Sequence, residues 1–105
     1  MKYNELSDAQ EESLVLLAEE CGEVVQCIGK ILRHGLTSRH PTKGGIDNRE
    51  WLTKELGDVL AAIKIMRKDC AISNGDIIHE QGRKLDNVGQ WLHYNHIALI
   101  ERNHQ

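Results

Sequence analysis

Apolar residues recur every three or four positions through most of this chain, and a single proline interrupts it. A repeat of about 3.6 residues is the period of an α-helix with one buried face. In the first run, the apolar positions are Leu14, Leu17, Ala18, Cys21, Val24, Val25, Ile28, Ile31 and Leu32. No segment alternates between apolar and polar residues as a half-buried strand does. The pattern therefore predicts an all-α fold, a small bundle of three long helices followed by a short C-terminal helix.

Residues that favour helix ends divide the chain into these predicted helices. The expected N-terminal caps are Ser7, with Gln10 as its capping-box partner, Asp47, with Glu50 in the same role, and Ser73 or Asn74. The helices are expected to extend to about residue 33, to about residue 70 and through residue 92, and the short one lies near 97–100. Gly35 is placed to end the first of them.

Residues 34–46 form the one long break in the helical pattern. They hold three glycines and the only proline. Connections of this length in a small domain often close over a binding site or contribute to it. No linker-like or repeated segment divides the chain elsewhere, so we expect one domain over residues 1–105.

Charge and composition argue against several classes of protein. The formal net charge is −3, from 16 acidic and 13 basic residues, whereas proteins that coat nucleic acid carry a basic excess. No apolar run is long enough to cross a membrane, and the first residues do not resemble a signal peptide. The three cysteines form no CxxC pair, which favours reduced thiols that fill apolar space. We therefore expect a cytoplasmic protein that binds neither nucleic acid nor membrane.

Two acidic pairs stand on the edges of the predicted apolar faces. Glu20 and Glu23 lie three residues apart on the first helix, and Glu55 and Asp58 have the same spacing on the second. Like charges at this spacing repel each other by about 0.2–0.5 kcal/mol even on an exposed helix. Partial burial makes an unpaired carboxylate more costly still. A compensating charge is therefore expected at these positions.

A divalent cation is the favoured source of that compensation. If the two helices pack antiparallel, the acidic pairs face one another and form an all-oxygen site, which suits Mg²⁺ or Mn²⁺ better than zinc or copper. No Glu-x-x-His motif of a di-iron bundle is present. The alternative is a pair of solvated helix faces with salt bridges to Lys30, Lys54 and Arg67, which would be preferred for one acidic pair alone.

Taken together, these residues resemble a known signature. The segment Glu19-Glu20-Cys21-Gly22-Glu23, followed by Glu55-Leu56-Gly57-Asp58, is similar to the EExxE…ExxD motif of the all-α MazG-type nucleotide pyrophosphohydrolases. The clear similarity covers residues 14 to about 66. The resemblance implies Mg²⁺-dependent hydrolysis of a nucleoside triphosphate to the monophosphate and pyrophosphate, for nucleotide-pool control or housecleaning.

The same resemblance implies roles for single residues. The metal ligands would be Glu20, Glu23, Glu55 and Asp58. Glu19 or Glu20 would take a proton from the attacking water and so be catalytic. The resemblance also points to substrate contacts by Arg83, Lys84 and Asn87. Three further candidates follow from their positions near the acidic pairs, namely Lys30, Arg33 and Trp51. For some of these a structural role is at least as plausible: Lys30 and Arg33 suit a helix C-terminus, and a tryptophan at a helix start is often core.

The apolar faces are wider than one small bundle needs, which predicts self-association. The resemblance also implies subunit contacts near the site, so we expect a homodimer or a tetramer of paired dimers. Two further interpretations stay open: a helical module whose acidic faces dock a basic partner, and a relative that binds nucleotide without turning it over. Neither the base nor the sugar of the nucleotide follows from the sequence.

Overall fold

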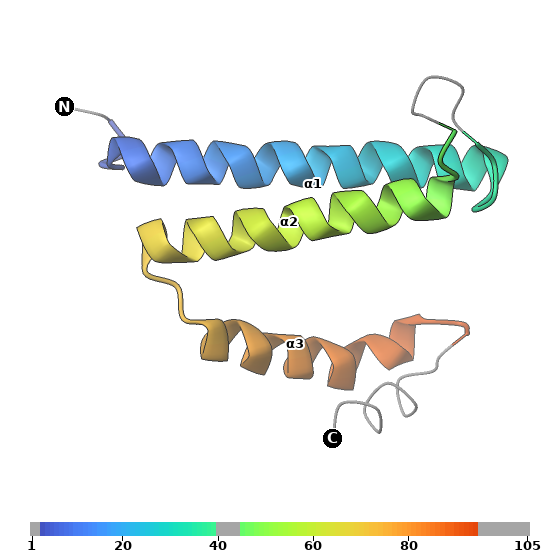
Figure 1. Cartoon of the computed structure of the whole chain (residues 1–105). Coiled ribbons are helices and arrows are strands. Elements are labelled where there is room, and N and C mark those ends of the chain that lie inside the picture. Colours follow the sequence, from blue (N-terminus) through green and yellow to red (C-terminus); the bar gives the residue numbers. More distant parts are fainter. Residues whose placement is uncertain (1–2, 40–44, 95–105) are drawn as a thin grey trace. The chain divides into compact units, whose positions relative to one another are not determined.

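The computed structural model describes residues 3–39 and 45–94, and all its regular elements in these ranges are helices. Helix α1 spans Asp8–His34, α2 spans Asn48–Cys70 and α3 spans Asn74–Val88, followed by a single 3₁₀ turn, η1, at Gly89–Trp91 (Figure 1). The all-helical prediction is confirmed. The third helix ends earlier than expected, and the short helix predicted near residues 97–100 lies outside the described residues.

All three predicted N-terminal caps form. The Ser7 hydroxyl accepts the backbone N–H of Gln10 at 3.1 Å, and the Gln10 side chain accepts the Ser7 N–H at 2.9 Å, which completes a capping box. The corresponding caps of α2 and α3 are Asp47 and Ser73. Each cap satisfies a backbone donor that has no partner within the helix, so these short side chains fix where the helices start.

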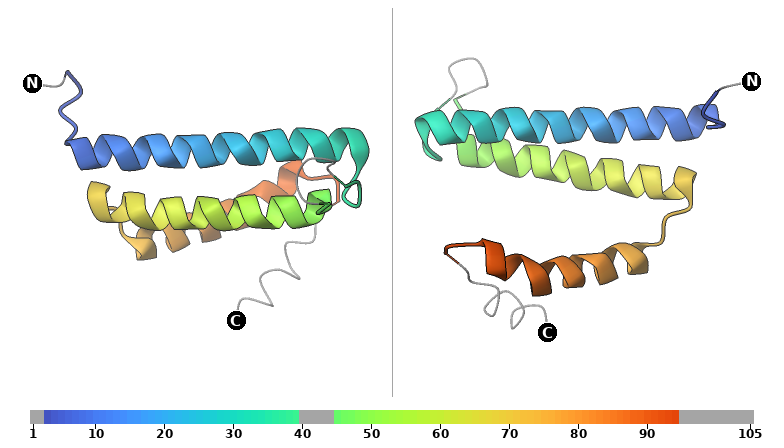
Figure 2. Two further views of the ribbon diagram at one scale, coloured as in Figure 1. Left: turned by 45° about the horizontal axis from the view of Figure 1, so that its top comes forward. Right: turned by 180° about the vertical axis from the view of Figure 1, so that it is seen from behind.

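The described residues fall into two compact units, one within Met1–Ala71 and one within Ile72–Gln105. The first unit is a hairpin in which α1 and α2 run antiparallel along each other (Figures 1 and 2). The second unit contains α3 and η1. All of the acidic motif residues belong to the helical hairpin, which therefore positions the candidate site.

The face of α1 that packs on α2 is offset from the predicted apolar stripe. Its buried residues are Ser13 and Cys27, whereas Val25 and Leu32 of the predicted stripe are 69% and 83% exposed. The prediction of the core face was therefore wrong for one edge of the stripe, while the other edge is half-buried, at Leu17, Val24 and Ile31. Successive residues of a helix are about 100° apart, so α1 carries two neighbouring stripes that both have helical spacing. Periodicity alone does not select the stripe that faces α2.

Polar contacts join the two helices at both ends of the hairpin. At the open end, the Gln10 amide donates to the backbone carbonyl of Asp69 at 3.2 Å. At the loop end, the buried thiol of Cys27 donates to the carbonyl of Asn48 at 3.9 Å. Asn48 is itself buried, and its side-chain amide donates to the carbonyl of Gly35 at 2.9 Å. These contacts fix the register of α1 against α2.

The expectation that all three cysteines fill apolar space holds for one of them. Cys27 is buried, Cys70 is half-buried and Cys21 is exposed, and all three are free thiols. As for membranes, none of the helices in the described ranges is both long and apolar enough to cross a bilayer.

Candidate metal centre

The hairpin register brings acidic residues from both helices together. Glu20 lies on α1 between the two cross-helix contacts made by Gln10 and Cys27. It therefore faces the middle of α2, where Glu55 and Asp58 project from successive turns. One carboxylate oxygen from each of these three residues lies within 4.8 Å of the other two. The juxtaposition predicted for an antiparallel hairpin is present for three of the four acids.

The three carboxylates differ in their exposure to water. Glu55 is buried at 8% exposure, Glu20 is half-buried and Asp58 is exposed. Loss of solvent around Glu20 raises the pKa of its carboxyl above the ordinary value of 4.5, and the negative charges of Asp58 and Glu55 raise it further. The group is therefore a local concentration of negative charge.

Glu19 and Glu23 lie close to this group without joining it. Both are exposed on α1, and neither is among the three acids whose oxygens converge. Their charges nevertheless contribute to the raised pKa of Glu20, with smaller effects than those of Asp58 and Glu55. Their roles as second catalytic acid and fourth ligand stay predictions.

Trp51 makes a direct contact with the acidic group. Its indole Nε1 donates a hydrogen bond to Oε1 of Glu55 at 3.0 Å, and the residue is only 4% exposed. The contact with Glu55 is observed, whereas the predicted contact of Trp51 with substrate stays a prediction. Sequence reasoning missed this bond, although the spacing of four residues on a helix was a usable signal.

The two basic candidates on α1 lie toward the loop end of the hairpin. Lys30 is half-buried and Arg33 is exposed in the last turn of the helix. Cations here interact favourably with the helix C-terminus whether or not a nucleotide is bound. The structure places them on the same helix as Glu20 but in later turns, and it leaves their role in substrate binding as a prediction.

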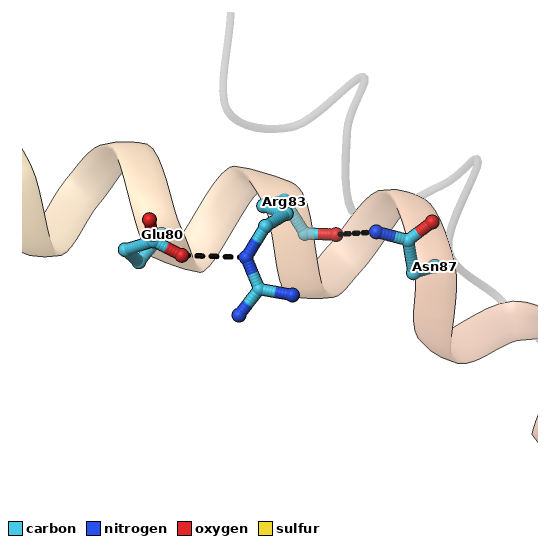
Figure 3. Close-up of polar contacts among 3 residues, drawn as sticks. All are labelled: Glu80, Arg83 and Asn87. Carbon is cyan, nitrogen blue, oxygen red and sulfur yellow. Dashed lines mark hydrogen bonds and ion pairs between the residues drawn. The ribbon is translucent and has the colours of Figure 1, made fainter.

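The three candidates on α3 are exposed, and two of them have partners within the helix. Arg83 Nε donates to Oε2 of Glu80, and the Asn87 amide donates to the carbonyl of Arg83 at 2.8 Å (Figure 3). The bond and charge of Arg83 lower the pKa of Glu80. Lys84 lies beside them on the same helix and is exposed. These residues belong to the second unit.

The residues of the acidic group fit a hard divalent cation. Three carboxylates on two helices offer only oxygen ligands, as Mg²⁺ and Mn²⁺ prefer. The indole N–H on Glu55 matches the hydrogen bond that orients many metal-binding carboxylates. A cation would also remove the mutual repulsion that raises the pKa of Glu20.

Comparison with known families identifies the family of the chain. A family model described as the MazG nucleotide pyrophosphohydrolase domain matches residues 9–91. The chain belongs to this family. The match begins in the first turn of α1 and ends at the last residue of η1, so it covers nearly all described residues and both units of this MazG domain. No curated protein and no solved structure gives a significant match.

The raised pKa of Glu20 predicts a pH dependence of the metal-free stability. The folded state binds a proton on Glu20 more tightly than the unfolded state does. As pH falls through the folded pKa toward 4.5, Glu20 becomes protonated and the free energy of unfolding increases. As pH rises, the carboxyl ionises and this increase is lost. Glu20→Gln should therefore be more stable than wild type at neutral pH, and the difference should shrink on acidification. Urea unfolding in EDTA across this pH window measures it.

Glu80→Gln is the matched control, because the pKa of Glu80 is shifted in the opposite direction. It should be no more stable than wild type at neutral pH. A Glu20→Gln variant that is less stable than wild type at neutral pH without metal would contradict the electrostatic description of the acidic group.

Proposed function

We propose that this MazG domain hydrolyses nucleoside triphosphates to the monophosphate and pyrophosphate, with Mg²⁺, or Mn²⁺ in its place. The proposal rests on the convergence of Glu20, Glu55 and Asp58 within 4.8 Å between α1 and α2, in a family of nucleotide pyrophosphohydrolases. These three acids would hold the cation, and Glu23 would complete the set. When bound, the cation neutralises phosphate oxygens and lowers the pKa of a coordinated water.

Glu20 and Glu19 are the proposed proton acceptors. Glu20 is placed for this role because its carboxylate is one of the three that converge where the cation and its water would lie. Glu19 precedes it on the exposed side of α1 and could hold a water by hydrogen bonding. In this scheme the chain orients the water and takes its proton as the bond to the α-phosphorus forms and the bond from that phosphorus to the leaving pyrophosphate breaks.

Binding of the rest of the nucleotide is assigned to basic and amide side chains. Lys30 and Arg33 on α1, with Arg83, Lys84 and Asn87 on α3, supply donors for phosphate, sugar or base. We propose that residues 1–105 act as one catalytic domain, which the family match across both units supports. A cytoplasmic location, inferred from the three free thiols, belongs to the same proposal.

The products of the reaction test the proposal. Each common ribo- and deoxyribonucleoside triphosphate is incubated with the protein and Mg²⁺, and the products are resolved. We expect monophosphate and pyrophosphate from at least one of them, because the attack is directed to the α-phosphorus. Diphosphate and orthophosphate would contradict this mechanism, and the sequence holds no GxxxxGK[ST] loop to support such cleavage.

No turnover with either Mg²⁺ or Mn²⁺ would reject catalysis on these substrates. Binding of nucleotide without turnover would then favour the non-catalytic relative. Absence of both nucleotide and metal binding would favour a module that docks protein partners.

Self-association is the second part of the proposal. The exposed stripe on α1 consists of Leu14, Ala18, Cys21, Val25, Ile28 and Leu32. Repeating at intervals of three and four residues, it forms one continuous face that α2 does not cover. We therefore propose that a second copy of the chain covers it, in a homodimer or a tetramer of paired dimers.

Charges placed in the exposed stripe should dissociate the oligomer. Val25→Glu combined with Leu32→Glu leaves the α1–α2 contact intact, because both side chains already face water in the hairpin. Light scattering at micromolar concentration should show a dimer or larger species for wild type and a monomer for the double variant. Gln26→Glu is the control, since Gln26 is exposed on the same helix but lies outside the stripe. A monomeric wild type would contradict the proposal.

A further inference from the structure

The indole of Trp51 is hydrogen-bonded to Glu55, the only buried residue of the three converging acids. Its Nε1 is 3.0 Å from Oε1 of Glu55, and both side chains are buried. We infer that Trp51 is a positioning residue, whose N–H fixes the Glu55 carboxylate toward Glu20 and Asp58 so that the cation binds. This inference rests on the proposed function, because it presupposes that the acidic group holds a metal.

Local helix geometry explains how the two side chains meet. Trp51 precedes Glu55 by four residues, so both lie on the same face of α2. Helical side chains lean toward the N-terminus, which carries the Glu55 carboxylate back over Trp51. The backbone N–H of Trp51 donates to the carbonyl of the cap residue Asp47 at 3.0 Å. The indole therefore projects from a helix start that is already fixed.

The chemistry of the bond suits a ligand-orienting role. An indole N–H can only donate a hydrogen bond and an ionised carboxylate can only accept one, so the direction of this bond is fixed. It occupies one lone pair of Glu55 and leaves the others for a cation. Because Glu55 is buried, few water molecules can take the place of that donor. A phenyl ring at position 51 would remain apolar but would leave this oxygen without its partner.

The alternative is that Trp51 only fills space, and the experiment must separate the two roles. The chain has two tryptophans, and Trp91 is 79% exposed. In a Trp91→Phe background, Trp51 is therefore the single tryptophan. Growth of a tryptophan auxotroph on benzothienylalanine then replaces the indole N–H by sulfur and keeps the bicyclic shape. Trp51→Phe provides a second variant that also lacks the donor.

Metal affinity is the first readout. The dissociation constant for Mg²⁺ is obtained without nucleotide from the rise of the melting temperature with Mg²⁺ concentration, for wild type, Trp91→Phe and both position-51 variants. Loss of a hydrogen bond to a metal ligand typically weakens metal affinity by about 10–100-fold. We expect a shift of that size for both position-51 variants and none for Trp91→Phe. Saturating Mg²⁺ should restore most of the turnover, because affinity rather than chemistry is lost.

Fluorescence supplies a second readout. In Trp91→Phe the emission of Trp51 should change as Mg²⁺ neutralises the carboxylate 3.0 Å from the indole nitrogen, and it should be half-saturated at the dissociation constant found from the thermal measurement. The change should be absent in Trp91→Phe combined with Glu55→Gln.

The outcomes distinguish this inference from the proposed function. If the benzothienylalanine protein binds Mg²⁺ as tightly as Trp91→Phe, Trp51 is a packing residue and only the inference is overturned. If wild type itself shows no Mg²⁺-dependent stabilisation, the metal site is absent and both the inference and the proposed function fail.

Discussion

Replacing Asp58 by Asn, or Glu55 by Gln, should reduce nucleotide hydrolysis by at least ~100-fold, the scale on which one preorganised electrostatic contact with the transition state contributes. Both substitutions keep the size of the side chain and remove one negative charge from the group that converges within 4.8 Å. The remaining two carboxylates would hold a divalent cation less tightly. Initial rates at several Mg²⁺ concentrations, with pyrophosphate as the measured product, test this expectation.

Folding and activity must be separated in that experiment. Helix content by circular dichroism should stay at the wild-type level, because Asp58 is exposed and because losing a carboxylate relieves repulsion on Glu20. Glu12→Gln is the matched control: it removes one negative charge from an exposed position of α1, away from the acidic group. It should keep normal turnover. Near-normal turnover by Asp58→Asn would show that the site has been assigned to the wrong residues.

Mg²⁺ should also raise the melting temperature of the protein by a large amount. A ligand present at about 100 times its dissociation constant stabilises the folded state by about 2.7 kcal/mol. For a domain of this size that corresponds to about 10–20 °C. The effect is expected because the cation binds Glu20, Glu55 and Asp58 only when α1 and α2 are packed together. Thermal unfolding followed by circular dichroism, with and without Mg²⁺, measures it.

Salt screening is the effect to exclude. Any salt weakens the repulsion within the acidic group, so NaCl at matched ionic strength is the required comparison. EDTA should reverse the shift. Glu55→Gln should lose most of the Mg²⁺-specific part, while Glu12→Gln should keep it. Equal stabilisation by NaCl and MgCl₂ would mean that the acids are screened rather than bound to a metal.

Local sequence signals were sufficient for the helices and for their first residues. Ser7, Asp47 and Ser73 cap α1, α2 and α3, as their side chains and spacing predicted. Capping depends on a few neighbouring residues, so the information is contained within one turn of the chain. The family assignment likewise followed from two short acidic motifs whose spacing is fixed by the helix itself.

The core face of α1 required tertiary structure. The apolar pattern favoured a stripe with Val25 and Leu32, yet α2 packs along the neighbouring stripe with Ser13 and Cys27. Both stripes have helical period, and the choice depends on which partner covers each one. A sequence read one helix at a time contains no information about that partner. The exposed stripe therefore became visible only once the hairpin was in place.

In the candidate site, too, some features follow from the sequence and others only from the tertiary structure. The sequence by itself determined which acids lie on one face of each helix, because residues three apart on a helix are neighbours whatever surrounds them. Only the tertiary structure decided that Glu20 joins Glu55 and Asp58, while Glu23 stays outside the converging group. It also decided that Trp51 is buried and bonded to Glu55. Burial and cross-helix distance depend on the register between α1 and α2, and contacts distant in sequence set that register.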